Sequence, residues 1–119
     1  MINKDLWANS GHFNEDQFAF LHNLVSSLKP AYALEIGFCS GRSSYAVLEA
    51  GKMSLNKMIS IDIDLDYNPF GREYKDKLEA HYKDNNFKVI EACSHATLDS
   101  FFLEENFTSG LDIAVIDGD

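Results

Sequence analysis

Apolar residues along the chain follow two repeats, one typical of helices and one typical of short buried strands. The first helical repeat covers residues 14–30, where Asn14 can cap the helix and pair with Gln17 three residues later. Pro30 is expected to end this helix, because a proline cannot continue the pattern of backbone hydrogen bonds. The apolar stripe of the helix is expected to comprise Phe18, Leu21, Val25 and Leu28.

Four short apolar runs follow, each separated from the next by roughly one strand–helix unit. The predicted strands cover residues 32–36, 58–61, 87–92 and 113–116. Helical patterns fill the intervals, at residues 43–52, 68–85 and 94–106. In the second of these helices Asn68 is the expected cap, with Pro69 in the first turn.

The alternation of strands and helices predicts an α/β fold with a doubly wound, mostly parallel sheet and helices on both faces. We expect one domain over residues 1–119, in which residues 1–30 form a leading helical segment and residues 31–119 build the cofactor-binding part. The run at 113–116 is continuously apolar, which suits a strand that is covered on both faces.

The chain has 119 residues and a formal net charge of -9. An acidic surface with scattered basic residues argues against nucleic acid or an anionic membrane as the main partner. No apolar run approaches the roughly 20 residues that a membrane helix needs. The first residues lack the apolar core of a secretory signal, so a cytoplasmic location is expected.

The turn after the first predicted strand carries the strongest chemical signal, which reads Glu35-x-Gly37-x-x-x-Gly41-x-Ser43. Ligands of such sheets bind beyond the carboxyl ends of the strands. Gly37 permits a tight turn with positive φ, and Gly41 removes a side chain where a ligand could approach the backbone. Ser43 and Ser44 stand at a helix start, where free N–H groups favour a carboxylate or a phosphate.

The second predicted strand ends in acids that suit a ribose. Asp62 follows the apolar run directly, near the separation of about 20 residues at which nucleotide-binding folds place this acid after the glycine turn. We therefore assign ribose binding to Asp62, with Asp64 as the alternative.

The sequence from Glu35 to Ser44, EIGFCSGRSS, resembles motif I of the class I S-adenosylmethionine-dependent methyltransferases. The run IDGD at the end of the chain resembles a second motif of the same family. This resemblance covers residues 31–119 and implies a Rossmann-like sheet with strand order 3-2-1-4 and S-adenosyl-L-methionine as the cofactor. It also implies methyl transfer to a small-molecule or glycan-type acceptor.

The family resemblance implies further site residues near the later strands. Glu35 would steady the loop and the ammonium group of the cofactor, Ser94 would contribute a hydroxyl after the third strand, and Asp117 would line the pocket. Some members of the family bind a divalent cation at such an aspartate, so Asp117 and Asp119 are candidate ligands of Mg²⁺. No residue of the chain stands out as a general base.

Two alternative functions stay open at this point. One is an enzyme of Rossmann type that binds NAD or a nucleotide sugar, although position 39 is cysteine where the dinucleotide motif has glycine. The other is a cofactor-binding fragment without catalytic activity. Because the family sheet continues beyond its fourth strand, the chain is expected to be truncated there, and to self-associate through residues 111–116.

Overall fold

A computed structural model describes residues 14–93 and 110–116 of the chain. The first helix of this part is α2 (Glu15–Leu28), and its predicted capping box is confirmed. The Asn14 carboxamide oxygen accepts from the Gln17 N–H at 2.9 Å, and the Gln17 side chain accepts from the Asn14 N–H at 2.9 Å. Of the predicted apolar stripe, Leu21 and Val25 are buried, whereas 52 % of the surface of Leu28 is exposed.

The four predicted strands form one parallel sheet in the order β3-β2-β1-β4. Their bounds are β1 (Tyr32–Ile36), β2 (Lys57–Asp62), β3 (Phe87–Glu91) and β4 (Ile113–Ile116). The register pairs Glu35 with Ser60 on one side and with Val115 on the other. It also places Asp62 beside Glu91 at the carboxyl end of the sheet.

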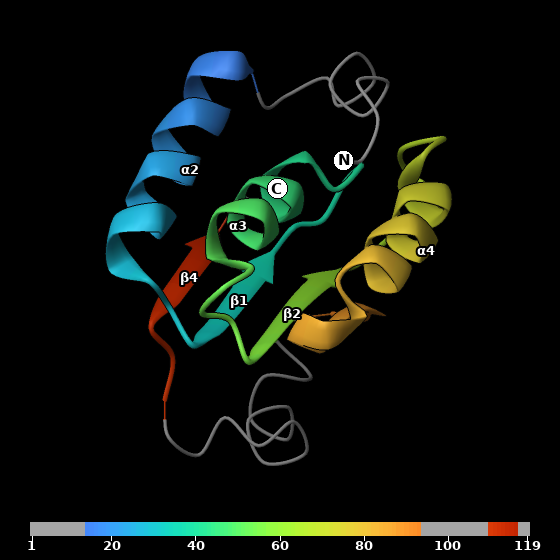
Figure 1. The fold of residues 1–119 in the computed structure, drawn as a ribbon. Helices are drawn as coiled ribbons and strands as arrows, with labels where there is room; N and C mark the ends of the chain where they lie inside the picture. Colours follow the sequence, from blue (N-terminus) through green and yellow to red (C-terminus); the bar gives the residue numbers. More distant parts are fainter. Residues whose placement is uncertain (1–13, 94–109, 117–119) are drawn as a thin grey trace.

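Helices α2, α3 (Arg42–Gly51) and α4 (Gly71–His81) lie on the same face of the sheet (Figure 1). The larger apolar core fills the space beneath them and draws on all three helices and all four strands. A smaller cluster lies on the opposite face of the sheet and consists of Leu34, Ile59 and Ile61. The helix predicted at residues 94–106 lies outside the described residues.

Helix α4 begins two residues later than the sequence pattern predicts. The Asn68 side chain accepts from the N–H of Phe70 at 2.9 Å and forms a local turn instead of capping a helix that starts at Pro69. The helix begins at Gly71, where the backbone of Leu65 passes so closely that a Cβ would lie 2.2 Å from the Leu65 carbonyl oxygen. It ends at His81 and continues as a short 3-10 helix, η1 (Lys83–Asn85).

Strand β4 is an edge of the sheet within the described residues, since it pairs with β1 alone. The burial on both faces that its sequence suggests is not observed, because Ala114 and Ile116 are exposed. Among the helices of residues 14–93, none has the length and apolar content that a bilayer crossing requires.

We predict that Gly71→Ala destabilises the protein although alanine is the better helix former. The new methyl group would overlap the backbone of Leu65, and overpacking of this kind costs about 1–3 kcal/mol. Gly51→Ala is the matched control, because its methyl group would meet the end of the Leu55 side chain, at 2.9 Å, and no backbone atom. Urea unfolding of both variants should show the larger loss at Gly71. Equal losses would contradict the steric explanation.

Candidate cofactor-binding site

The loop between β1 and α3, residues 37–41, forms the centre of the candidate site. Three of its residues have positive φ: Gly37 at 100°, Cys39 at 55° and Gly41 at 88°. A Cβ at Gly41 would lie 2.6 Å from a methyl carbon of Leu78 and 2.7 Å from the ring of Phe38. Packing within the protein therefore explains glycine at position 41, and its contact with a cofactor stays a prediction.

Asp62, the residue predicted to bind ribose, holds this loop in place. Its Oδ2 atom accepts from the N–H groups of Phe38 at 2.9 Å and Cys39 at 2.8 Å. Its Oδ1 atom accepts from the N–H of Asp64 at 2.9 Å. A carboxylate has about four acceptor positions, so the arrangement leaves Asp62 about one position for a ligand.

Asp64 lies two residues beyond, is exposed, and accepts from the N–H of Asp66 at 2.9 Å through Oδ1. By the same count it keeps more acceptor capacity than Asp62. The two acids are linked through the backbone N–H of Asp64, so the structure brings both ribose candidates to the same edge of the sheet.

Glu35 is fully buried beneath the start of α3. Its Oε1 atom accepts from the hydroxyls of Ser44 and of Ser60, the latter at 2.8 Å, and its Oε2 atom accepts from the Ser43 hydroxyl. The carboxyl group thereby connects β1, β2 and α3. The predicted role of Glu35 in steadying the loop agrees with this geometry, and its contact with an ammonium group stays a prediction.

The hydrogen bonds to Glu35 also define what Ser43 and Ser44 can offer to a ligand. A serine hydroxyl has one proton to donate, and in both residues that proton is directed to Glu35. A carboxylate at this position would therefore meet the backbone N–H groups of the first helical turn, which have no partner within the helix. Gly41 is the N-cap of α3, and no side chain among the described residues caps this helix.

A second loop, residues 63–70, packs against the glycine loop. The Asn68 amide donates to the sulfur of Cys39 at 3.6 Å, and Gly71 at the end of the loop lies close to the Cys39 carbonyl. Glu91 fixes the same loop by accepting from the N–H of Leu65 at 2.8 Å. Cys39 thus contacts the second loop through both its side chain and its backbone.

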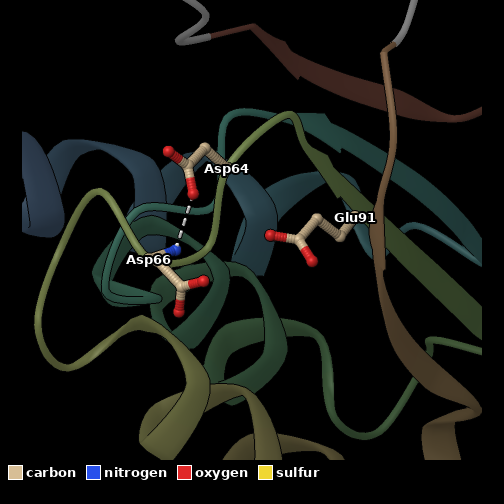
Figure 2. Close-up of side chains that lie close together, drawn as sticks. All are labelled: Asp64, Asp66 and Glu91. Carbon is tan, nitrogen blue, oxygen red and sulfur yellow. Dashed lines mark hydrogen bonds between the residues drawn. The ribbon is translucent and has the colours of Figure 1, made fainter.

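Three exposed carboxylates, Asp64, Asp66 and Glu91, gather beside this loop (Figure 2), with one oxygen of each within 4.8 Å of the others. Arg72 binds two of them: its Nε atom lies 2.6 Å from Asp66 and a terminal nitrogen lies 2.9 Å from Glu91. The guanidinium group therefore supplies the positive charge that a cation would bring, so this cluster is a poor fit for Mg²⁺.

Sequence reasoning missed Glu91 and Arg72. Glu91 follows an apolar run as Asp62 does, so an acid at the end of a strand was the signal that could have identified it. Arg72 gave no such signal, because its partners depend on the loop between β2 and α4. Other predicted site residues, Ser94, Asp117 and Asp119, lie outside the described part of the chain.

The pKa of the Glu91 carboxyl is lowered, first by the hydrogen bond from the Leu65 N–H and then by Arg72. A carboxylate with a lowered folded-state pKa stabilises the fold above its ordinary pKa. That contribution disappears as the pH falls through the lowered value. The anchoring of the second loop is therefore expected to weaken in acid.

We predict that Arg72→Gln raises the pKa of Glu91 toward its ordinary value. The rise should be incomplete, because the hydrogen bond from Leu65 stays in place. Carboxyl carbon NMR titration would measure the change. Lys77→Gln is the control, since Lys77 pairs with Glu73 instead and should leave the Glu91 titration unchanged.

We predict that Glu35→Gln lowers the free energy of unfolding by about 1–3 kcal/mol, the range for a disrupted buried hydrogen-bond partner. The new amide group would place two N–H donors against hydroxyls that now donate to the carboxyl. Denaturant unfolding gives the measurement, with the exposed Glu73→Gln as control, which should change stability by less than about 0.5 kcal/mol. A Glu35 variant as stable as the control would contradict this account of the buried cluster.

No family model matches the sequence, and no curated protein matches it either. Solved structures do resemble the fold. An O-methyltransferase from Bacillus cereus in complex with S-adenosylhomocysteine (SAH) aligns with a TM-score of 0.64 at 22% identity, over 94% of this chain and 49% of its own. The SAH-bound methyltransferase PaMTH1 from Podospora anserina aligns with a TM-score of 0.71 at 20% identity, over 96% and 48%.

A third similar structure is the O-methyltransferase TomG from Streptomyces achromogenes, solved with S-adenosylmethionine (SAM). It aligns with a TM-score of 0.74 at 16% identity, over 99% of this chain and 55% of its own. The chain therefore spans about half the length of these structures. At such identities the likeness concerns the fold, and it agrees with the observed strand order β3-β2-β1-β4. The chain has the Rossmann-like fold of the class I S-adenosylmethionine-dependent methyltransferases.

Proposed function

We propose that the chain binds SAM at the carboxyl ends of β1 and β2 and forms the cofactor-binding part of a methyltransferase. The observation that carries this proposal is the loop at residues 37–41. Its backbone is held by Asp62 through the N–H groups of Phe38 and Cys39, and the helix start behind it is held by the buried Glu35. Similar folds are known with SAM or SAH bound.

The methionine part of the cofactor would lie against the glycine loop and the start of α3. Its carboxylate would meet the N–H groups of the first helical turn, where the helix dipole also favours a negative charge. Ser43 and Ser44 would act there through their backbone, because their hydroxyls donate to Glu35. Gly37 and Gly41 would shape the turn on which this part of the cofactor rests.

The ribose would be shared between Asp62 and Asp64. Asp62 has about one acceptor position left after it has bound the loop, whereas Asp64 is exposed and keeps more. We therefore assign one ribose hydroxyl to each acid. Loss of Asp62 would weaken binding more than loss of Asp64, because Asp62 also holds the glycine loop. Ser94 and Asp117 would complete the adenine and substrate sides of the pocket.

The cofactor supplies a reactive methyl group, so the protein mainly has to position the reactants and exclude water. A nucleophile of the acceptor, a small molecule or a glycan, would displace the sulfonium sulfur directly. The described residues show no general base for this step. Because the chain spans about half of the similar structures, we expect the residues that bind the acceptor to come largely from the other half of such a fold.

We predict that SAH binds this chain more tightly than NAD or ATP does. The dinucleotide motif needs its second glycine at position 39, where this loop has a cysteine, and the loop is already fitted around that residue. Isothermal titration calorimetry with the three ligands measures the difference. A tighter complex with NAD would refute the proposal in favour of a dinucleotide-binding function.

We predict that Asp62→Ala weakens SAH binding by about 1.5–3 kcal/mol, the range for losing a charge-assisted hydrogen-bond partner. Asp64→Ala should weaken binding less, because it leaves the glycine loop intact. Unfolding curves of both variants distinguish the two causes of weaker binding. A loosened loop lowers the stability of the variant, whereas a lost ligand contact leaves its stability unchanged. A larger effect at Asp64 would show that the ribose rests mainly on that acid.

A methyl-transfer assay addresses the remaining alternative, a cofactor-binding fragment without activity. Binding of SAH without turnover of any small-molecule acceptor would support that alternative and leave the cofactor assignment intact. A chain that neither binds SAH nor turns over any acceptor would refute both the methyltransferase proposal and the fragment alternative.

A further inference from the structure

The turn at residues 64–66 carries Asp64, and two hydrogen bonds along the chain give this turn its shape. Asp62 Oδ1 accepts from the N–H of Asp64 at 2.9 Å, and Asp64 Oδ1 accepts from the N–H of Asp66 at 2.9 Å. Bonds of this kind, from an aspartate to the second residue after it, define a local turn. Because both bonds are local, the position of the turn over the sheet depends on contacts with other elements.

Glu91, the last residue of β3, supplies one such contact. Its Oε2 atom accepts at 2.8 Å from the N–H of Leu65, the residue directly after Asp64. The Leu65 side chain is buried in the larger core, so this residue is held through its side chain and its backbone together. Figure 2 shows Glu91 reaching from β3 toward the turn that carries Asp64 and Asp66.

Arg72 binds the same turn from the side of α4. Its Nε atom and one terminal nitrogen contact Asp66 at 2.6 and 3.0 Å, and that terminal nitrogen also lies 2.9 Å from Oε1 of Glu91. One oxygen each of Asp64, Asp66 and Glu91 lies within 4.8 Å of the others, so without a cation the three carboxylates would repel one another. The guanidinium group thereby allows Glu91 to stay at the N–H of Leu65.

We propose that Glu91 and Arg72 are positioning residues of the cofactor site, which hold Asp64 in place for the ribose without touching the ligand themselves. This inference rests on the proposed function, in which Asp64 accepts from one ribose hydroxyl. A hydrogen bond depends strongly on distance and angle. A carboxylate that is already held in place loses less freedom on binding than one on an untethered loop, so the tether raises the affinity for the ligand.

A second carboxylate with the same kinds of partner provides a matched control. Glu79 on α4 accepts from the N–H of Val89 at 2.9 Å and pairs with Lys75 at 2.8 Å. Like Glu91, it joins a backbone N–H to a basic side chain, but these partners belong to β3 and α4 and not to the turn at 64–66. Loss of either carboxylate removes the same kinds of bond, and only the loss of Glu91 should release Asp64.

Isothermal titration calorimetry with SAH tests the proposal. Glu91→Ala should raise the dissociation constant about fivefold, within the range for one hydrogen bond. The rise should not exceed that of Asp64→Ala, because Glu91 acts through that residue. Arg72→Gln should raise the constant by a smaller factor, since the bond to Leu65 stays in place, and Glu79→Ala should leave it unchanged. Circular dichroism establishes that each variant is folded.

The conservative variant Glu91→Gln tests the hydrogen bond itself. Its amide oxygen can still accept from the N–H of Leu65, so this variant should bind SAH more tightly than Glu91→Ala does. Equal affinities of the two variants would contradict the tether.

A double-mutant cycle distinguishes positioning from a general loss of stability. In a chain that already carries Asp64→Ala, the further change Glu91→Ala should weaken SAH binding by less than about twofold, since the residue that it positions is absent. Additive effects, or equal effects of Glu91→Ala and Glu79→Ala, would overturn the proposal. SAH binding that either Glu91→Ala or Arg72→Gln leaves unchanged would overturn it as well, while the proposed function stands. A wild-type chain that does not bind SAH would refute the proposed function itself, and this inference with it.

Discussion

The buried carboxyl group of Glu35 is the constraint on which the site depends. A buried acid needs hydrogen-bond partners, and here three serine hydroxyls donate to it, one from β2 and two from the first turn of α3. Because these donors come from different elements, the start of α3 has one position over the sheet that satisfies them together. That position directs the N–H groups of the first helical turn toward the carboxyl ends of the strands, where a ligand of this fold would bind.

The second constraint is the close packing around the two loops at this end of the sheet, residues 37–41 and 63–70. Gly41 lets Phe38 and Leu78 pack where a side chain would otherwise stand, and Gly71 lets the backbone of Leu65 pass over the start of α4. The two loops meet at Cys39, where Gly71 approaches its carbonyl group and Asn68 donates to its sulfur. Gly41 of the motif therefore serves this packing as much as it serves the turn.

Much of the fold could be predicted from the sequence, because short apolar runs separated by helical patterns leave few alternatives to a parallel sheet. The capping box of α2 was equally readable, since all of its partners are local. The start of α4 was not readable, because it depends on how the loop before it folds back and brings the backbone of Leu65 against Gly71. The sequence also identified Asp62 as a site residue. It did not show that the N–H groups of the glycine loop bind this carboxylate. Arg72 could not be identified either, because its partners come together only in the folded chain.

The parallel register has an electrostatic consequence. By placing Asp62 beside Glu91, with Asp64 and Asp66 on the loop that follows, it gathers four carboxylates at one edge, and Arg72 offsets only part of their charge. Such an edge attracts cations over about a Debye length, roughly 10 Å in 0.1 M salt. SAM carries a sulfonium cation that SAH lacks. With the function proposed above, the edge would retain the incoming cofactor more strongly than the spent one, and added salt would diminish this preference for the charged form.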